Sequence, residues 1–359
     1  MEQNSQKHTL HNPLRVGIIG CGNIADSHVK AWKNAGTTVV AVCDRDISLA
    51  KSKAQKWGVA HYYGDVHELI KEQTIDVASV CTSANVRLAV VEPLLENKIH
   101  VAVEKPFAMS VEEAEKMVEL KKKNGVQLTV LHNWLFSLMM KKVIRSLERN
   151  ELGDILGVEM ELLHTKDDHM AANSSHWCHS IEAGRFGEML PHVVYILRAF
   201  LGEVEVKYIL GSKLGSYSWM PIDELRILFS TPEAKTASVY VSFNSPRSEV
   251  TLKIIGTKGV LASNLSTDIY IKRKYGFISI SQIVSEDMHL LKEHLNARAS
   301  FAFAVLSGRY KGAHFEVIRA FKNSLINNSK LPVSAEEALK VVKLHKSLCH
   351  QINEQYYRK

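Results

Sequence analysis

The chain has 359 residues, of which 46% are hydrophobic and 23% charged, and its formal net charge is +7. This length exceeds one ordinary domain, because domains hold roughly 100 to 200 residues, so we expect two of them. The composition excludes a disordered or low-complexity chain, and no apolar run reaches the roughly 18 residues typical of a membrane-spanning helix.

The amino-terminal residues and the cysteines indicate the compartment. The first residues, MEQNSQKHTLHN, are polar and lack the apolar centre of a secretory signal. The odd number of cysteines, without a CxxC pair, favours reduced packing residues over a disulfide framework. We therefore expect a cytoplasmic protein. The five cysteines are Cys21, Cys43, Cys81, Cys178 and Cys349.

The basic residues are spread along the chain. The densest cluster, Lys121 to Lys123, lies at the polar end of an expected helix, where a solvated face explains it better than nucleic-acid contact. We predict a small-molecule substrate and neither a nucleic acid nor a membrane as partner. The surplus of positive charge can still help to hold an anionic ligand such as a dinucleotide.

The first third of the chain alternates short apolar runs with helical stretches. Runs that are apolar almost throughout are typical of parallel strands covered by helices on both faces. Successive βαβ units of this kind build one parallel sheet, so we predict an α/β domain over residues 1–132. The expected strands are residues 15–20, 38–44, 76–82, 100–105 and 126–131.

After His132 the pattern changes. A helix is expected at about 136–150, and another within GEMLPHVVYILRAFLG, with a strand near 155–165 between them. Strands then follow strands, which predicts a mostly antiparallel sheet in an α+β domain over residues 133–359. The later strands are expected at 205–211, 224–230, 236–243, 249–256, 259–264 and 268–274.

A glycine motif, GCGNIA, joins the first expected strand to the first expected helix. Gly20 permits a tight turn, Gly22 lets backbone approach a pyrophosphate, and Ala25 allows close helix packing. The helix start at Asn23 and Ile24 offers N–H groups to phosphates. The motif indicates a site for nicotinamide or a similar dinucleotide, and the alternative is a glycine turn without a ligand.

Two charged residues at the end of the second expected strand bear on the choice of cofactor. Asp44 lies 24 residues after Gly20, where its carboxylate would accept hydrogen bonds from the ribose hydroxyls of adenosine. It would also repel a 2′-phosphate, whereas Arg45 beside it could pair with that phosphate. We predict NAD or NADP, with NAD slightly favoured.

Three further segments carry a family resemblance: VAVEKPFAMSVEEAEKM, LTVLHNWLFSLMMKKVIRSLERNELGDILGVEMEL and GEMLPHVVYILRAFLG. In order and spacing they resemble the glucose-fructose oxidoreductase, inositol dehydrogenase and rhizopine catabolism family (Gfo/Idh/MocA). The resemblance implies a Rossmann NAD(P)-binding domain followed by an open, mostly antiparallel sheet flanked by helices. It also implies an active site between the domains and a homodimer or homotetramer formed through the second sheet.

The resemblance implies an oxidoreductase that moves a hydride between nicotinamide and a carbinol or keto carbon of a sugar, polyol or sugar derivative, including nucleotide-linked or acidic ones. By position, Lys105 and His192 are the acid/base candidates, and either could be the main one. Many members have Asp-x-Gly-x-His where this chain has Glu188 and His192, so Glu188 could orient the imidazole or contact substrate. The bond between Lys105 and Pro106 is a candidate for the cis form.

Other residues join the expected cofactor site by position. Thr82 and Ser83 stand where many members have Thr-Pro-Asn-x-x-His, and Arg87 replaces that histidine. Arg87 could meet a phosphate or carboxylate, or form no more than a surface salt bridge. Glu104, before Lys105, completes the set as a partner that fixes the turn or the lysine.

The expected substrate pocket draws on aromatic residues. Asn133 and Trp134 follow the fifth strand, where the family turns toward the substrate, although hinge packing is the alternative. Trp177 lies in a variable loop, and its ring face would suit a sugar.

Histidines near Trp177 raise the question of a metal site, but only two are closely spaced and no HExxH-like array accompanies them, so we predict no metal. Two other functions stay open: a non-catalytic NAD(P) and sugar sensor, and a reductase of a C=N or conjugated double bond. The histidines in question are His164, His169, His176 and His179.

Overall fold

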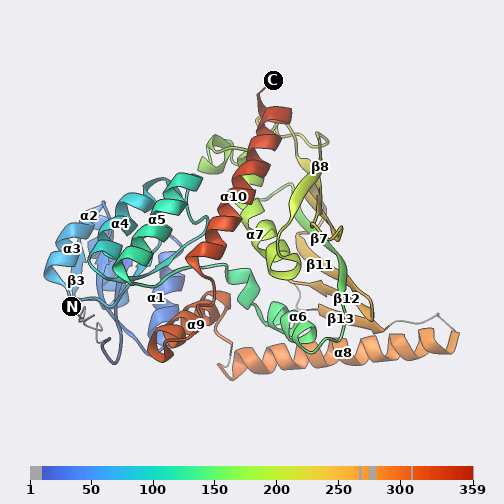
Figure 1. The fold of residues 1–359 in the computed structure, drawn as a ribbon, viewed down its shortest axis with the longest axis horizontal. Coiled ribbons are helices and arrows are strands. Elements are labelled where there is room, and N and C mark those ends of the chain that lie inside the picture. Colours follow the sequence, from blue (N-terminus) through green and yellow to red (C-terminus); the bar gives the residue numbers. More distant parts are fainter. Residues whose placement is uncertain (1–9, 267–268, 275–279, 309, 359) are drawn as a thin grey trace, which may run out of the picture. The chain divides into compact units, whose positions relative to one another are not determined.

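The structure is a computed structural model, and contacts among its described residues divide the chain into two units (Figure 1). The first unit is Met1–Asn133 with Gly312–Val342, and the second is Trp134–Lys311 with Lys343–Lys359. Each unit has its own sheet. The described residues are 10–266, 269–274, 280–308 and 310–358.

The described residues of the first unit form a six-stranded parallel sheet in the order β3-β2-β1-β4-β5-β6. This order places β1 beside β4 at the centre, so the chain reverses its direction of winding there. The predicted α/β domain is confirmed, and β3 is the strand that the sequence did not predict. The strands are β1 (Arg15–Ile19), β2 (Thr38–Cys43), β3 (His61–Tyr63), β4 (Val77–Val80), β5 (His100–Val103) and β6 (Leu128–Val130).

Local signals explain where the helices of this unit begin and end. Ser110 accepts a hydrogen bond from the Glu113 N–H and so caps α5, and Gly125 ends that helix with φ +67°. Pro93 lies inside α4, near its end. The helices between the strands are α1 (Ala25–Asn34), α2 (Ile47–Trp57), α3 (Val66–Glu72), the short η1 (Ala84–Val86), α4 (Arg87–Glu96) and α5 (Val111–Asn124).

A late segment of the chain also packs in the first unit. Helix α9 (Ala313–Asn327) contacts α1, where the ring of Phe321 meets Trp32 edge-on at 6.4 Å. Thr129 of β6 donates to the Val333 carbonyl at 2.7 Å, just before α10 (Ala335–Ile352). The predicted second domain, residues 133–359, therefore contains a segment, Gly312–Val342, that belongs to the first unit. Periodicity along the chain does not reveal such a return.

The described residues of the second unit form a seven-stranded sheet in the order β13-β12-β11-β7-β10-β9-β8. Its pairs are antiparallel except β7 with β10, which confirms the predicted, mostly antiparallel architecture. The strands are β7 (Ile155–Thr165), β8 (Glu205–Ser212), β9 (Glu224–Ser230), β10 (Thr236–Ser245), β11 (Glu249–Gly256), β12 (Gly259–Asn264) and β13 (Ile269–Lys274).

The two faces of this sheet differ. Helix α7 is buried along most of its length and packs against β7 and β10, where Met160 and Val239 are buried. The opposite face carries Glu159, Arg226 and Tyr240 and forms a concavity of about 510 Å³. Strand alternation therefore gives one core face and one mixed polar face. The remaining helices are η2 (Asn133–Phe136), α6 (Leu138–Glu148), η3 (Trp177–Ser180), α7 (Gly184–Leu201), α8 (Ile280–Leu306) and η4 (Asn353–Tyr357).

Helix α8 follows β13 and was not predicted from the sequence. It contacts β13 and runs along the edge of the second sheet (Figure 1). Val284, Met288, Leu291 and Leu295 are all more than half exposed, at spacings of three and four residues. These apolar residues therefore share one exposed face of the helix.

Two whole-chain expectations concern membranes and cysteines. Among the described residues, no helix has the length and apolar character needed to cross a bilayer. The cysteines are free and buried, as expected for packing residues. Burial raises the pKa of Cys21, Cys43 and Cys349 to about 12, so these thiols stay protonated at neutral pH.

Candidate active site

The glycine loop between β1 and α1 has the backbone that its sequence predicts. Gly20 has φ +91°, and a Cβ there would lie 2.8 Å from the Thr82 backbone nitrogen, so only glycine fits. Gly22 is exposed, and the position of its missing Cβ has no atom within 4 Å. Backbone at Gly22 is therefore open to close approach by a ligand.

The start of α1 differs from the starts of α2, α3 and α5. Those three helices are capped by the side chains of Asp46, Asp65 and Ser110. At α1 the cap position is Ile24, preceded by the exposed Asn23, and no side chain caps the first turn. A helix start without a side-chain cap, directly after an open glycine, suits a bound phosphate.

Asp44 stands at the end of β2, beside the glycine loop. Its Oδ2 accepts from the Cys21 N–H at 2.7 Å, and its Oδ1 accepts from the Asp46 N–H at 3.0 Å. Asp44 therefore braces the loop as well as standing where the ribose was expected. Arg45 is exposed.

Thr82 and Ser83 follow β4 at the same edge of the sheet. Thr82 Oγ1 is buried and has no hydrogen-bond partner among the described residues. A buried hydroxyl without a partner is costly, so this atom is suited to a bound group. Ser83 is exposed, and its hydroxyl donates to Asn85 Oδ1 at 2.6 Å.

Arg87 is only 1% exposed, which excludes the surface salt bridge that was one of its two alternatives. Its guanidinium donates to the carbonyl oxygens of Glu104 at 2.6 Å, of Pro106 and of Thr82. Burial lowers the pKa of Arg87 to about 10, which still leaves it charged at neutral pH. Through its two terminal nitrogens the side chain thus ties the end of β4 to the Glu104–Pro106 turn.

The turn after β5 carries Glu104 and Lys105. The bond between Lys105 and Pro106 is cis, as the sequence suggested. Lys105 is partly exposed, and its backbone N–H donates to Glu104 Oε2 at 3.1 Å. The carboxylate of Glu104 therefore fixes the turn on which the lysine stands.

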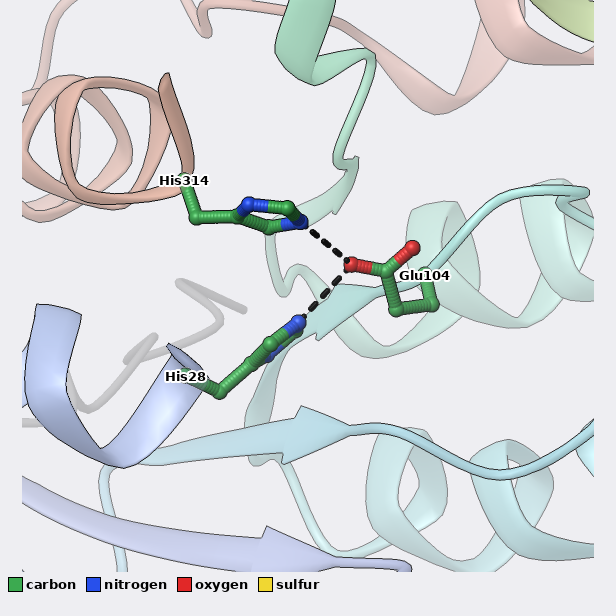
Figure 2. A group of neighbouring side chains, drawn as sticks. All are labelled: His28, Glu104 and His314. Atoms are coloured by element: carbon green, nitrogen blue, oxygen red, sulfur yellow. Dashed lines mark hydrogen bonds and ion pairs between the residues drawn. The ribbon is translucent and has the colours of Figure 1, made fainter. Parts of the chain in front are cut away.

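Glu104 lies among imidazoles (Figure 2). Its Oε1 is 2.8 Å from His28 Nε2 and 3.3 Å from His314 Nε2. Burial would raise the pKa of Glu104, but hydrogen bonds from His28 and His314 outweigh it and hold that pKa well below its usual range. Nearby His132 is buried, which lowers its pKa to about 3, so it is neutral at pH 7.

In the second unit, His192 lies on α7 and is 7% exposed. Its Nδ1 is 2.6 Å from the Tyr195 hydroxyl, which also accepts from the Trp134 N–H at 3.2 Å. The ring of Trp134 stacks on the imidazole, with centroids 4.1 Å apart. Tyr195 and Trp134 therefore fix the orientation of His192.

Glu188, one turn before His192 on α7, is paired with Arg185, whose Nη1 donates to Glu188 Oε2 at 2.6 Å. Arg185 is buried and also holds Asp168, at 3.2 Å from Nε to Oδ1. Burial would raise the pKa of Asp168, but hydrogen bonds from His164 and Arg185 hold it well below its usual range. This network anchors the loop before α7 to the helix that carries His192.

The loop before α7 presents Trp177, which is 55% exposed and lies 5.5 Å from the His176 ring. His179 contacts the Met170 carbonyl at 2.9 Å, and His169 meets His176 edge-on at 6.4 Å. The exposed indole can accept a sugar ring. These histidines make ring and backbone contacts with the loop itself.

Comparison with known proteins decides the family. Residues 14–132 match the model described as "Oxidoreductase family, NAD-binding Rossmann fold", and residues 140–262 match the GFO/IDH/MocA C-terminal domain. The chain belongs to the GFO/IDH/MocA oxidoreductase family. Its first unit thus contains the family's NAD-binding Rossmann fold, and the glycine loop, the open start of α1 and the unpartnered Thr82 hydroxyl fit that cofactor.

Relatives within and around this family cover the chain to different extents. Myo-inositol 2-dehydrogenase of Thermotoga maritima is 24% identical over 331 residues, 90% of this chain and 92% of that protein. An oxidoreductase of Formosa agariphila is 28% identical over 202 residues, 55% of this chain and only 63% of that protein. The WlbA dehydrogenase of Bordetella pertussis, solved with NADH and UDP-GlcNAcA, is 17% identical with a TM-score of 0.75, covering 95% of this chain and 96% of that one, which shows a shared fold.

Several residues of this GFO/IDH/MocA protein were missed by the sequence analysis. The strand-end positions of its first unit were found because motifs mark them. His28 and Arg185 lie inside helices and lack such a signal, although the Arg in GRFGEMLPH is charged within an otherwise apolar segment. His314 and Tyr195 acquire their roles only through contacts with distant or next-turn residues.

Proposed function

We propose that this protein is an NAD(P)-dependent dehydrogenase that transfers a hydride between nicotinamide and a carbinol or keto carbon of a sugar, polyol or sugar derivative. The observation that carries the proposal is the match to both family models, combined with a glycine loop whose Gly22 is open to a ligand. T. maritima myo-inositol 2-dehydrogenase aligns over nine tenths of the chain and supports a polyol or sugar.

Residues of the first unit would hold the cofactor. The backbone at Gly22 and the start of α1 would bind the pyrophosphate, and Asp44 would accept hydrogen bonds from the ribose hydroxyls. The same carboxylate disfavours a 2′-phosphate, so NAD is the preferred cofactor, while the exposed Arg45 leaves NADP as the alternative. When bound, the nicotinamide supplies hydride transfer.

The acid/base chemistry is assigned to Lys105 and His192. A carbinol carbon loses hydride only as its hydroxyl proton leaves, so a base and a cation beside the oxygen both help. His192, oriented by Tyr195 through Nδ1, would exchange that proton. Lys105, held at the turn by Glu104, would steady the oxygen as negative charge develops. Glu188 is bound to Arg185, which gives it a positioning role on α7.

Particular residues and the net charge narrow the substrate class. Asn133, Trp134 and the exposed Trp177 are proposed to contact the substrate, with the indole face of Trp177 against the sugar ring. The positive net charge favours nucleotide-linked or acidic sugars within the class.

The proposal is tested by incubating the purified chain with NAD or NADP and a panel of polyols, aldoses, uronic acids and nucleotide sugars. Formation of reduced nicotinamide is followed by absorbance, and we expect turnover with at least one of these. Cofactor binding without turnover on any of them would favour the sensor. Turnover confined to imines or conjugated double bonds would favour the alternative reductase.

We also propose that the protein is a homodimer or homotetramer through the mixed polar face of its second sheet. Exposed Tyr208 and Leu228 lie opposite each other on β8 and β9, beside the concavity on that face. Light scattering should give a multiple of 40.3 kDa. Leu228→Glu should lower the mass to one chain, while Leu214→Glu, outside the sheet strands, should not. An unchanged mass for Leu228→Glu would place the interface elsewhere.

The cytoplasm is the proposed compartment. Free, buried cysteines support it, because thiols persist where the environment is reducing. Fluorescence of a carboxyl-terminal fusion in fractionated cells is the check, and recovery in a secreted or membrane fraction would contradict it.

A further inference from the structure

Three side chains in the first unit converge on one point (Figure 2). His28 comes from α1, Glu104 follows β5, and His314 is the second residue of α9. One ligand atom from each, an imidazole nitrogen or a carboxylate oxygen, lies within 4.8 Å of the other two. Among the described residues, no other group of three or more histidine, cysteine or acidic side chains has its ligand atoms this close together.

The donor atoms and their orientation suit a cation. Both imidazoles direct Nε2 at the same carboxylate oxygen, Oε1 of Glu104, at 2.8 and 3.3 Å. Ligands of a tetrahedral Zn²⁺ at about 2.0 to 2.2 Å lie roughly 3.3 Å apart, so small shifts of the side chains would admit the ion. Two imidazoles with one carboxylate are typical ligands of zinc and similar divalent metals.

The surrounding groups resemble the support that metal ligands usually have. His28 Nδ1 is 2.9 Å from Ser79 Oγ, which also accepts from Trp32 Nε1. A ring N–H donated to Ser79 would leave the lone pair of Nε2 directed at the ion. The second oxygen of Glu104 is held by the Lys105 N–H. The side chains of His28 and Glu104 are thus both held in place by hydrogen bonds on the side away from the ion.

Asn133 adds an independent observation. Its Oδ1 is buried and has no hydrogen-bond partner among the described residues, while its Nδ2 lies 3.3 Å from His314 Nε2. The oxygen and nitrogen of an amide exchange places on a 180° flip, so Oδ1 can occupy the position facing His314. In that orientation Oδ1 could bind an ion beside His314, and Nδ2 would take the buried position that Oδ1 now holds.

We propose that His28, Glu104 and His314 bind one divalent transition-metal ion of the zinc type, with Asn133 Oδ1 as a fourth ligand. His28 is fully buried and Glu104 nearly so, whereas the His314 side chain is 24% exposed, so the ion enters from the His314 side. The ion joins α9 to α1 and to the turn that carries Lys105. Its role is to hold the returning segment and that turn in place.

The experiment titrates Co²⁺, whose visible absorption reports tetrahedral coordination, into the full chain after chelation and desalting. We expect bands that saturate at one ion per chain and disappear when Zn²⁺ is added. His314→Ala should weaken binding by about 100-fold or more, because loss of a ligand costs more than the 10- to 100-fold lost with a supporting residue. Asn133→Ala should also weaken it.

His176→Ala is the matched control, because it removes a histidine from the loop before α7 and should leave the titration unchanged. Circular dichroism checks that each variant is folded, and the titration of the unmodified chain decides the matter if His314→Ala does not fold. If the unmodified chain shows no saturable Co²⁺ absorption, the proposal is overturned and the three side chains form only a hydrogen-bonded cluster. Binding lost with His176→Ala but kept with His314→Ala would also overturn it. The readout is metal binding, so it is independent of dehydrogenase activity.

Discussion

Glu104 in the first unit and Asp168 in the second are both carboxylates largely removed from water, but different groups compensate them. Asp168 faces the guanidinium of Arg185, which is always charged, as well as the imidazole of His164. Glu104 instead faces the imidazoles of His28 and His314 and, among the described residues, no guanidinium. An imidazole can donate a hydrogen bond while neutral, so the carboxylate of Glu104 has hydrogen-bond donors but no permanent cation as its partners in the part of the chain that the structure describes. The difference separates a fixed ion pair that anchors a loop from a hydrogen-bonded cluster beside the proposed catalytic lysine.

The largest effect is expected from Asp168→Asn, which leaves Arg185 charged and buried with Glu188 as its remaining carboxylate. Breaking a buried pair by removing one partner is costly, and we expect the free energy of unfolding to fall by about 3 kcal/mol. Urea denaturation measures it. Asp167→Asn, at the exposed neighbouring position, is the control and should change little. A loss as small as that of the control would show that the pair does not stabilise the unit.

Lys105→Ala tests whether the lysine beside the Glu104 cluster takes part in catalysis. We expect kcat to fall by about 10²-fold or more, the usual contribution of a positioned acid/base group, with NAD affinity little changed. Steady-state kinetics and a separate binding titration distinguish the two quantities. Lys122→Ala, on the exposed end of α5, should leave both unchanged. An unaltered kcat in Lys105→Ala would remove the lysine from the mechanism.

Glu104→Gln should cost less stability than Asp168→Asn, by the contrast drawn above. The amide oxygen can still accept a hydrogen bond from an imidazole or from the Lys105 N–H, and the substitution deprives no permanent cation of an ion-pair partner. We expect a loss of about 1 to 2 kcal/mol in the free energy of unfolding. The exposed Glu112→Gln is the matched control. A larger loss than for Asp168→Asn would reverse the comparison.

Gly22→Ala separates cofactor binding from folding. The site of the added methyl group is open, so stability should change by less than about 0.5 kcal/mol, whereas NAD affinity should fall by about tenfold or more. Gly20→Ala, by contrast, should destabilise the fold, because φ is +91° and the methyl group meets the backbone at Thr82. Unchanged NAD affinity in Gly22→Ala would place the pyrophosphate elsewhere.

Mild acid should produce the smallest change in stability of the unmodified protein. The pKa values of Glu104 and Asp168 are both lowered in the folded state, so their contribution is complete at neutral pH and is lost as the pH falls below about 4.5, where the unfolded chain takes up protons. Between pH 5 and 4 we expect a loss under about 1 kcal/mol. Melting temperatures across pH 3 to 7 should decline less steeply in Asp168→Asn. Equal slopes of melting temperature against pH in the variant and the unmodified protein would contradict this.

The parts of the site that could be predicted from sequence are those that local rules define. Gly20, Gly22 and Asp44 were placed correctly beside one another because a strand, a tight turn and a helix start follow directly in the chain. For Arg87 the sequence left open a phosphate or carboxylate contact and a surface salt bridge, and it did not predict the burial of the side chain. Its burial depends on the Glu104–Pro106 turn, whose carbonyl oxygens face it only once β4 and β5 are paired.

Sequence alone determined the order of strands and helices, the dinucleotide motif and the family, because hydrophobic period and turn residues act over a few neighbours. Tertiary structure decided which charged groups are buried and what compensates them. His28 and His314 belong to one cluster only because α9 packs against α1, and Arg185 meets Asp168 only because the loop folds back on α7. Such contacts depend on packing between distant segments, for which a single chain carries no local pattern.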